Sequence, residues 1–280
     1  MRRRGLGLAL LLAGLLPPGL ATAGAEELQW NAGLGLATLI YPSWRGADDS
    51  NTLTLPAPVF SAWTEQAQLG QGGFNARFGL RERWQLRLSA SGSLPVDSDD
   101  APLREGMDDL DPTLEAGPAL GWHSPERGRW HLRAETLLRG ILSLSFDDPR
   151  WLGWTLQPRL ALHYEGFGAQ AVEGVQARLA VGPIWAQNKQ HRYFYAVAAD
   201  EARPDRPAYD PGGGYSGTRA NLSGTWSRGR LRVSAYVGYD DLRNTAFADS
   251  PLRPREDYWL SGLFLSWRFL GPPRPLDLDD

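Results

Sequence analysis

The sequence predicts an all-β protein: a transmembrane antiparallel up-and-down β-barrel of about 10–12 strands, with 12 preferred. Three observations predict this fold class. Apolar and polar residues alternate with a period of two along almost the whole chain. Many alternating stretches last about ten residues, which a tilted strand needs to cross a bilayer, whereas strands of soluble sandwiches are usually nearer five or six. The tryptophans fall at the ends of these stretches, as aromatic girdles at two membrane interfaces do.

The N-terminus predicts export. Arg2, Arg3 and Arg4 precede an apolar run at 5–16, and the small residues at 21–25 fit the cleavage pattern of a secretory signal peptide. We therefore expect residues 1–25 to be a cleaved signal peptide and residues 26–269 to form the barrel. An N-terminal membrane anchor is the alternative, but the run is shorter than the roughly 20 apolar residues of a spanning helix.

The composition excludes several classes of protein. The formal net charge of −3 includes the three signal arginines, so the mature chain carries −3 − 3 = −6, which argues against nucleic acid as a partner. The absence of cysteine excludes a disulfide framework, a lipoprotein anchor and a thiol nucleophile. A mean hydropathy of −0.37, without a long apolar stretch after the signal, excludes a helical membrane protein.

The alternation predicts eleven strands, near 28–40, 51–63, 69–80, 83–93, 112–123, 129–141, 151–164, 174–187, 217–227, 230–240 and 257–269. Where the alternation is clear, the apolar parity is carried in order by Leu34 and Leu36, Leu86 and Leu88, Leu114 and Leu120, Leu132 and Ala134, Leu160 and Leu162, Leu179 and Val181, Leu222 and Trp226, Val233 and Val237, and Leu263 and Leu265. Two termini on the same side of a membrane require an even number of strands, so one hairpin around 51–93 is misassigned or one strand is missed. Prolines at 56 and 58 and glycines at 70, 72 and 73 make this region the weakest. The best helical stretch is short, at 196–202.

The connections alternate between short and long. Segments 124–129 and 227–230 are tight, whereas segments 93–109, 188–216 and 240–258 are long. Because bacterial barrels have short periplasmic turns and longer outer loops, we expect the three long segments outside the cell and both termini in the periplasm.

Parity also predicts two sets of site residues. Membrane-girdle tryptophans open or close strands: Trp30, Trp63, Trp84, Trp122, Trp130, Trp151, Trp185, Trp226 and Trp267. The polar parity predicts a lumen lined by Arg87, Glu115, Arg133, Glu135, Arg139, Arg159, His163, Glu165, Arg178, Arg219, Arg232 and Arg268. These charges form either a basic constriction that favours anionic solutes or Arg–Glu pairs that plug the interior. The narrowness of a small barrel favours the plug.

Two further groups of residues could carry chemistry, but for each group a simpler interpretation is favoured. The acidic residues between Asp97 and Asp111 could hold a divalent cation that bridges to lipopolysaccharide, but a solvated loop is favoured. A barrel lipid hydrolase would need a Ser–His pair on the lipid side, whereas His131 and His163 share the lumen parity. We therefore expect no catalytic, cofactor or metal residues.

The C-terminal strand carries an assembly signal. Its ending on Trp267 and Phe269 resembles the signal that the barrel-assembly machinery of the outer membrane recognises. Residues 270–280, proline-rich and then acidic, are expected to form a disordered periplasmic tail.

Four segments, in order, resemble the MipA/OmpV family of MltA-interacting outer-membrane proteins: GLGLATLIYPSWRGADDS (33–50), GMDDLDPTLEAG (106–117), RPAYDPGGGYSGTRANLSGTW (206–226) and DSPLRPREDYWLSGLFLSWRF (249–269). The resemblance implies an outer-membrane barrel of a Gram-negative bacterium without catalytic residues. For some members it implies a scaffold that links a lytic transglycosylase to a peptidoglycan synthase, and for others the passage of solutes or antibiotics. The first expectation is therefore a scaffold in contact with lipid and lipopolysaccharide, the second a narrow channel for small anionic solutes, and a distant third a barrel hydrolase.

Overall fold

The computed structural model describes residues 28–64, 67–70, 73–81, 83–125, 128–145, 148–166 and 173–273. Its strands are β1 (Gln29–Tyr41), β2 (Asn51–Trp63), β3 (Ala67–Gly70), β4 (Gly73–Arg81), β5 (Trp84–Ser93), β6 (Thr113–His123), β7 (Trp130–Ser143), β8 (Trp151–Glu165), β9 (Gly174–Ala186), β10 (Gly214–Arg228), β11 (Leu231–Asp241) and β12 (Asp257–Leu270). The signal-peptide prediction, and the tail prediction from residue 274 on, lie outside the described residues.

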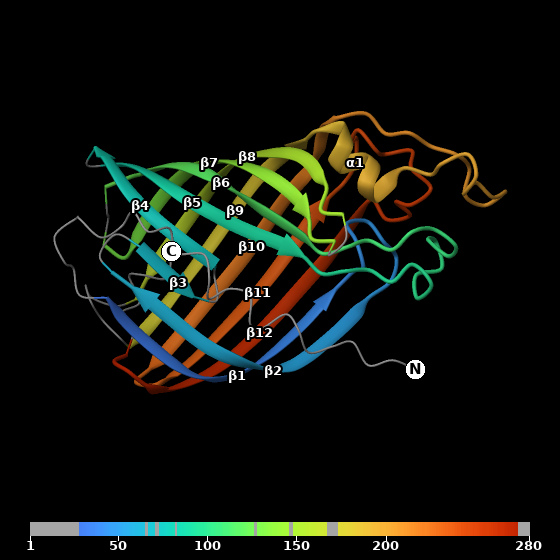
Figure 1. Ribbon diagram of the computed structural model, residues 1–280. Coiled ribbons are helices and arrows are strands. Elements are labelled where there is room, and N and C mark those ends of the chain that lie inside the picture. The colour runs from blue at the N-terminus through green and yellow to red at the C-terminus, as the bar shows by residue number, and fades with distance from the viewer. Residues whose placement is uncertain are drawn as a thin grey trace.

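The strands form one closed antiparallel up-and-down barrel in sequence order, and β1 pairs with β12 (Figure 1). The predicted fold class is therefore confirmed. Ten strands have at least ten residues, but the strand expected near 69–80 is divided into the four-residue β3 and the nine-residue β4. The preference for twelve full strands stays a prediction.

The barrel closes through a register shift between Ala32 and Gly33, where β1 meets the end of β12. A Cβ at Gly33 would overlap the carbonyl oxygen of Trp267 on the neighbouring strand. Glycine is therefore required at this position because the two backbones approach closely.

The two faces of the wall differ as the alternation predicts. The outer face presents large apolar side chains such as Leu34, which is 61% exposed, together with Leu160, Leu179 and Leu263. Soluble monomers rarely expose a contiguous apolar surface of this extent, so the outer face is the part of the barrel that contacts hydrocarbon. The inner face carries buried polar groups such as Glu135, which is 3% exposed.

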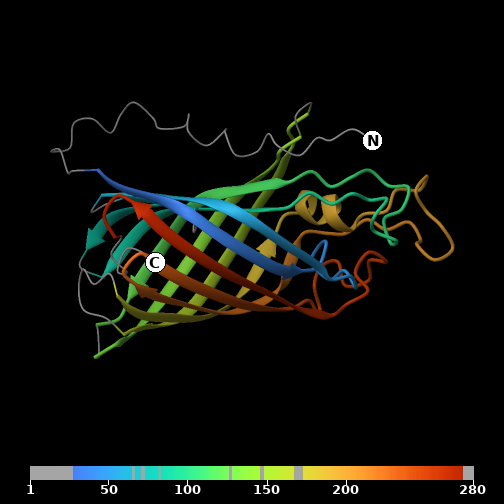
Figure 2. The same ribbon diagram turned by 90° about the horizontal axis from the view of Figure 1, so that it is seen from below.

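The long connections gather at one end of the barrel and form a folded cap, whereas the other end carries the tight turn at 229–230 between β10 and β11 (Figures 1 and 2). We name these the cap end and the turn end. The cap comprises residues 42–50, 94–112, 187–213 and 242–256. Its core contains Trp44, Ala47, Val96, Ala101, Leu110, Tyr195, Leu242 and Phe247.

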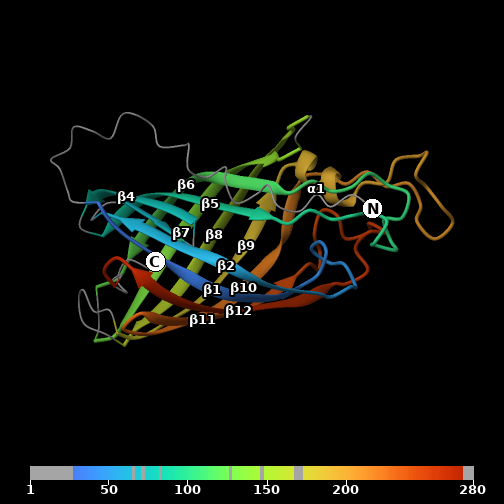
Figure 3. The same cartoon turned by 60° about the horizontal axis from the view of Figure 1, so that its bottom comes forward.

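One helix, α1 (Asn188–Tyr195), belongs to the cap (Figure 3). The stretch 196–202, which was only the best of the weak helical candidates, is not helical, and Val197 forms an isolated β-bridge with Tyr209. The helix begins earlier because Gln190, His191 and Tyr195 provide its buried side, with the Tyr195 ring stacked on Phe247 at 3.8 Å. No helix in the described part of the chain is long and apolar enough to cross a membrane.

Candidate functional site

The lumen is the candidate site. All twelve side chains predicted to line it lie on the inner face as buried or half-buried groups. They come mainly from β5 to β12, because every second residue of each strand points inward.

A group of four charged residues, which we call the Glu135 cluster, lies on the wall formed by β5, β7, β8 and β9. Glu135 forms ion pairs with Arg87, with Arg159 at 2.6 Å and with Arg178 at 3.2 Å. Three arginines share one carboxylate, so these four residues carry a charge of +3 − 1 = +2. The Arg–Glu pairing expected of a plugged interior is thus present here, yet the cluster remains electropositive.

The wall formed by β12, β1 and β2 is largely apolar on its inner face. A Cβ added at Gly35 would lie 2.6 Å from the Phe264 ring, and a Cβ added at Gly262 would lie 2.8 Å from the Leu39 side chain. The side chains of Phe264 and Leu39 therefore cover these glycines on the inner surface. On β2, Leu53 and Leu55 share the parity of the buried Val59. The lumen is therefore two-sided, with a basic wall and an apolar wall.

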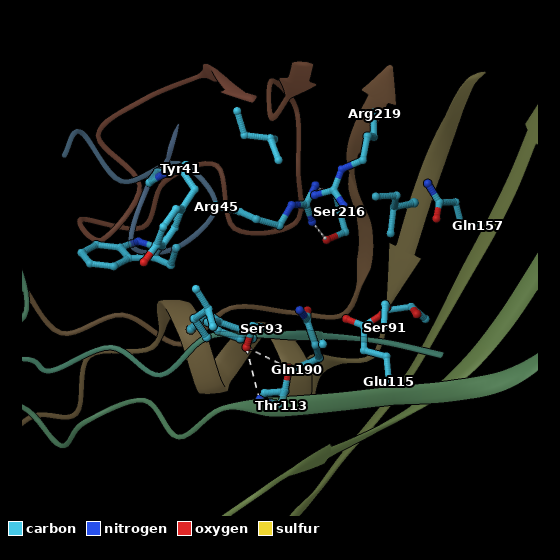
Figure 4. A pocket seen from close by; sticks show the side chains of 18 of the residues that line it. Tyr41, Arg45, Ser91, Ser93, Thr113, Glu115, Gln157, Gln190, Ser216 and Arg219 are labelled. Atoms are coloured by element: carbon cyan, nitrogen blue, oxygen red, sulfur yellow. Dashed lines mark hydrogen bonds between the residues drawn. The ribbon is translucent and has the colours of Figure 1, made fainter. Parts of the chain in front are cut away.

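Beneath the cap the lumen widens into a chamber of about 350 Å³ (Figure 4). Arg45 and Arg219 lie on one side of it, and Ser91, Glu115 and Gln190 lie across from them (Figure 4). Its apolar lining comes from both the barrel and the cap: Leu137, Ile184, Phe194, Tyr195, Tyr258 and Leu260.

A buried carboxylate ties the cap to the barrel at this chamber. Asp240 accepts hydrogen bonds from Arg45 at 2.9 Å, from Arg219 at 2.7 and 2.6 Å and from the Tyr258 hydroxyl. Burial alone would lower the pKa of the Arg45 guanidinium, but Asp240, together with Tyr258 and Tyr195, outweighs it and raises the pKa above its usual value. Arg45 therefore stays charged and anchors segment 42–50.

Arg139 is the least neutralised cation of the chamber. Its guanidinium is 3.6 Å from Glu115, a longer contact than Arg45 and Arg219 make with Asp240. Its remaining bonds go to the neutral hydroxyls of Ser89 and Ser91. Its Nε is buried without a hydrogen-bond partner among the described atoms.

Two histidines lie at the turn end of the lumen. The rings of His131 and His163 stack at 4.7 Å, and His131 lies 3.7 Å from Glu165. Both are buried inside the barrel, away from the lipid face that a barrel lipase would use. Within the described ranges, no group of three His, Asp or Glu side chains is placed to hold a metal ion.

Most predicted girdle tryptophans lie on the outer face. Trp30, Trp84, Trp122, Trp130, Trp226 and Trp267 are at the turn end, and Trp151 and Trp185 are at the cap end. Trp63 is the exception: it is 4% exposed and shares the parity of Val59 and Ser61, so it points inward. The girdle assignment is wrong for Trp63 because β2 carries Thr and Pro on its outer parity and apolar residues on its inner one. Trp154 and Trp259 are exposed on the outer face and were missed.

The two residues of the predicted assembly signal, Trp267 and Phe269, are exposed on the outer face at the turn end.

The residues that sequence reasoning missed include Arg45 and Gln190, which line the chamber, and the buried Asp240 behind its wall. Asp240 continues the inner parity of Arg232 and Ser234, so extending the alternation to the end of β11 would have found it. Arg45 and Gln190 lie in cap segments, where no period assigns a face.

A closed barrel with apolar outer and polar inner faces defines an outer-membrane β-barrel protein. The particular family follows from the sequence: residues 34–269 match the family description "MltA-interacting protein MipA", and the chain belongs to this family. The family resemblance is therefore confirmed, and with the barrel it points to the outer membrane of a Gram-negative bacterium.

Three solved structures with low similarity to this chain are described as a porin, a toluene transporter and an outer membrane protein. The NanC porin is 10% identical with a TM-score of 0.34, over 86% of this chain and 99% of that one. The toluene transporter TodX of Pseudomonas putida is 10% identical with a TM-score of 0.33, over 86% and 89%. The outer membrane protein OprD of Pseudomonas aeruginosa is 9% identical with a TM-score of 0.27, over 87% and 94%. A search of curated proteins found no match.

Proposed function

We propose that this protein is a non-enzymatic outer-membrane barrel that binds and passes small anionic solutes through its lumen. The observation that supports this most is the charge of the inner face. Eight arginines face the lumen against Glu115, Glu135, Glu165 and Asp240, a balance of +8 − 4 = +4 over these residues. Rings of arginine are the usual source of anion preference in narrow pores.

The passage is narrow. The Glu135 cluster occupies part of the basic wall, and the cap covers the chamber above it. A small barrel leaves little room beyond its own side chains, so the solute is of low molecular mass and the conductance is small. The chamber of about 350 Å³ lies within the range of small-molecule pockets.

Planar-bilayer recording under a potassium chloride gradient tests this function. The reversal potential of the wild-type barrel is expected to show preference for chloride. Arg159→Glu reverses one charge of the Glu135 cluster and should shift the reversal potential toward potassium, whereas Arg243→Gln, in an exposed part of the cap, should not. A wild type without steady conductance would refute the proposal.

The second function is a scaffold for cell-wall enzymes. The family description names interaction with MltA, which supports a protein partner. The family resemblance implies that such partners are a lytic transglycosylase and a peptidoglycan synthase. Affinity capture from detergent, followed by identification of a transglycosylase among the bound proteins, tests it. Deletion of 270–280 should abolish the capture if the tail makes the contact. Capture that is no stronger than with an unrelated outer-membrane barrel would refute the scaffold.

A further inference from the structure

The barrel wall is incomplete between β2 and β5. On one side, β2 pairs with β1 from Asn51 to Trp63, but on the other side β3 pairs only with Ala62 and Trp63. Likewise β5 pairs with β6 along its length, but β4 reaches only its first four residues, 84–87. Residues 51–61 of β2 and 88–93 of β5 therefore border an opening without strand pairing among the described residues. We call these two edges the β2–β5 seam.

The width of the seam follows from strand spacing. The β3–β4 hairpin ends well short of the cap end, whereas β2 and β5 continue toward it (Figure 1). Neighbouring strands lie about 4.8 Å apart, so β2 and β5 are separated by three spacings, about 14 Å, where the hairpin stops. A backbone separation of this size exceeds the width of a ring or an alkyl chain.

The sequence of β2 suits a free edge. Pro56 and Pro58 lie opposite Leu36 and Leu34 within an unbroken ladder with β1, so their missing N–H groups fall on the seam side. An unpaired N–H in hydrocarbon costs several kcal/mol, and proline removes that donor at both positions. The two prolines that made this strand hard to assign from sequence are those that a free edge favours.

The β5 edge of the seam borders the chamber. Ser91, Gly92 and Ser93, on the seam edge of β5, belong to the chamber lining. On the opposite edge Leu55 has the inner parity and yet is 40% exposed. Irregular backbone at membrane depth is tolerated where it lines a cavity, and here the seam edge of β5 lines one.

The chamber lining selects an amphipathic ligand. Its charged lining groups are Arg45, Arg139, Arg219 and Glu115, which together carry +3 − 1 = +2, and the buried Asp240 behind the wall pairs with Arg45 and Arg219. Arg139 has spare capacity to donate to a carboxylate. Apolar side chains line much of the rest.

We propose that the chamber is a binding site for a small amphipathic monocarboxylate, which passes between it and the membrane through the β2–β5 seam. The carboxylate bonds to Arg139, and the apolar part packs against Leu137, Ile184 and Leu260. This inference rests on the proposed solute function and adds the ligand class and a side route.

The first experiment measures ligand class by calorimetry on the full barrel in lipid nanodiscs, with empty nanodiscs subtracted. Benzoate carries both a ring and a charge, benzyl alcohol lacks the charge and gluconate lacks the ring. Benzoate is expected to bind about tenfold more tightly than either, which is the scale of one charge-assisted hydrogen bond. Arg139→Gln should weaken benzoate about tenfold, whereas Arg150→Gln, on the exposed surface outside the chamber, should leave it unchanged. Equal binding of benzoate and gluconate overturns the ligand class.

The second experiment tests the seam with single cysteines, because the native chain has none. A fluorophore is attached at Leu55→Cys, at the lipid-facing Leu222→Cys or at the inward-facing Ser223→Cys, in vesicles whose lipids carry brominated acyl chains. The Leu55 label should be quenched like the Leu222 label, since hydrocarbon reaches the seam. Quenching no greater than at Ser223 overturns the side route.

These outcomes are separable from those of the proposed function. Chloride preference measured in planar bilayers can hold while benzoate fails to bind, which overturns only the inference. Benzoate binding and seam quenching can hold without conductance, which overturns only the passage of small ions along the lumen.

Discussion

Replacement of Asp240 by Asn is expected to release the segment 42–50 of the cap without unfolding the barrel. Asp240 is 0% exposed and is shared by Arg45, Arg219 and Tyr258. Asparagine keeps the shape but removes the charge, so two guanidinium groups lose the carboxylate that compensates for their burial. Breaking a buried ion pair in this way costs about 3–5 kcal/mol. The segment can escape the cost by opening, because Arg45 then reaches water, and its open population should rise by a factor of about 10² or more.

Hydrogen–deuterium exchange of the barrel in detergent measures this opening. Segment 42–50 should exchange faster in Asp240→Asn than in the wild type, while β8 and β9, whose backbone bonds are independent of Asp240, should remain protected. Asp241→Asn is the matched control, since its partner Arg243 lies on the exposed surface and water compensates for the change. Unchanged exchange at 42–50, or equal acceleration in the control, would refute the assignment of Asp240 as the anchor.

Three further predictions concern the cap and barrel assembly. Burial lowers the pKa of His191 below its ordinary value of 6.5. Cap stability is therefore complete above about pH 6.5 and falls as the pH drops below it, so loop proteolysis should increase below about pH 6.5, and His191→Asn should abolish the increase. Gly33→Ala places a Cβ against the carbonyl of Trp267 and should reduce the heat-modifiable species on gels, whereas Gly224→Ala, with its nearest atom at 3.7 Å, should not. Phe269→Ala is expected to lower the amount of folded barrel in cells but not refolding in detergent, because this residue is predicted to be part of the signal that the assembly machinery recognises.

The alternation correctly predicted which face of a strand points inward wherever polar residues face the lumen and apolar residues face the lipid. Arg133 and Glu135 alternate with Leu132 and Ala134, and a one-residue shift would place charge in lipid, so parity is strongly specified there. On β2 the rule fails because Leu53, Leu55 and Val59 face an apolar part of the lumen while threonines and prolines face outward.

The cap lay beyond sequence reasoning for a different reason. Its core joins side chains that are distant in the chain: the Trp44 indole donates to the Leu252 carbonyl at 2.7 Å, and the Tyr195 hydroxyl donates to the Arg45 carbonyl at 2.9 Å. No local period encodes such contacts, because each segment becomes ordered only against the others. The chamber roof, including Gln190, therefore required the three-dimensional structure.

The way the cap is joined together has an immunological consequence. The segments around Trp44, Tyr195 and Ser250 contribute adjacent parts of one surface, linked by bonds such as that from the Ser250 hydroxyl to the Tyr195 carbonyl at 2.8 Å. Antibodies raised against the native surface would therefore recognise conformational epitopes, and a synthetic peptide copied from any single loop would compete poorly for them. A vaccine antigen based on this surface would need the intact barrel to present it.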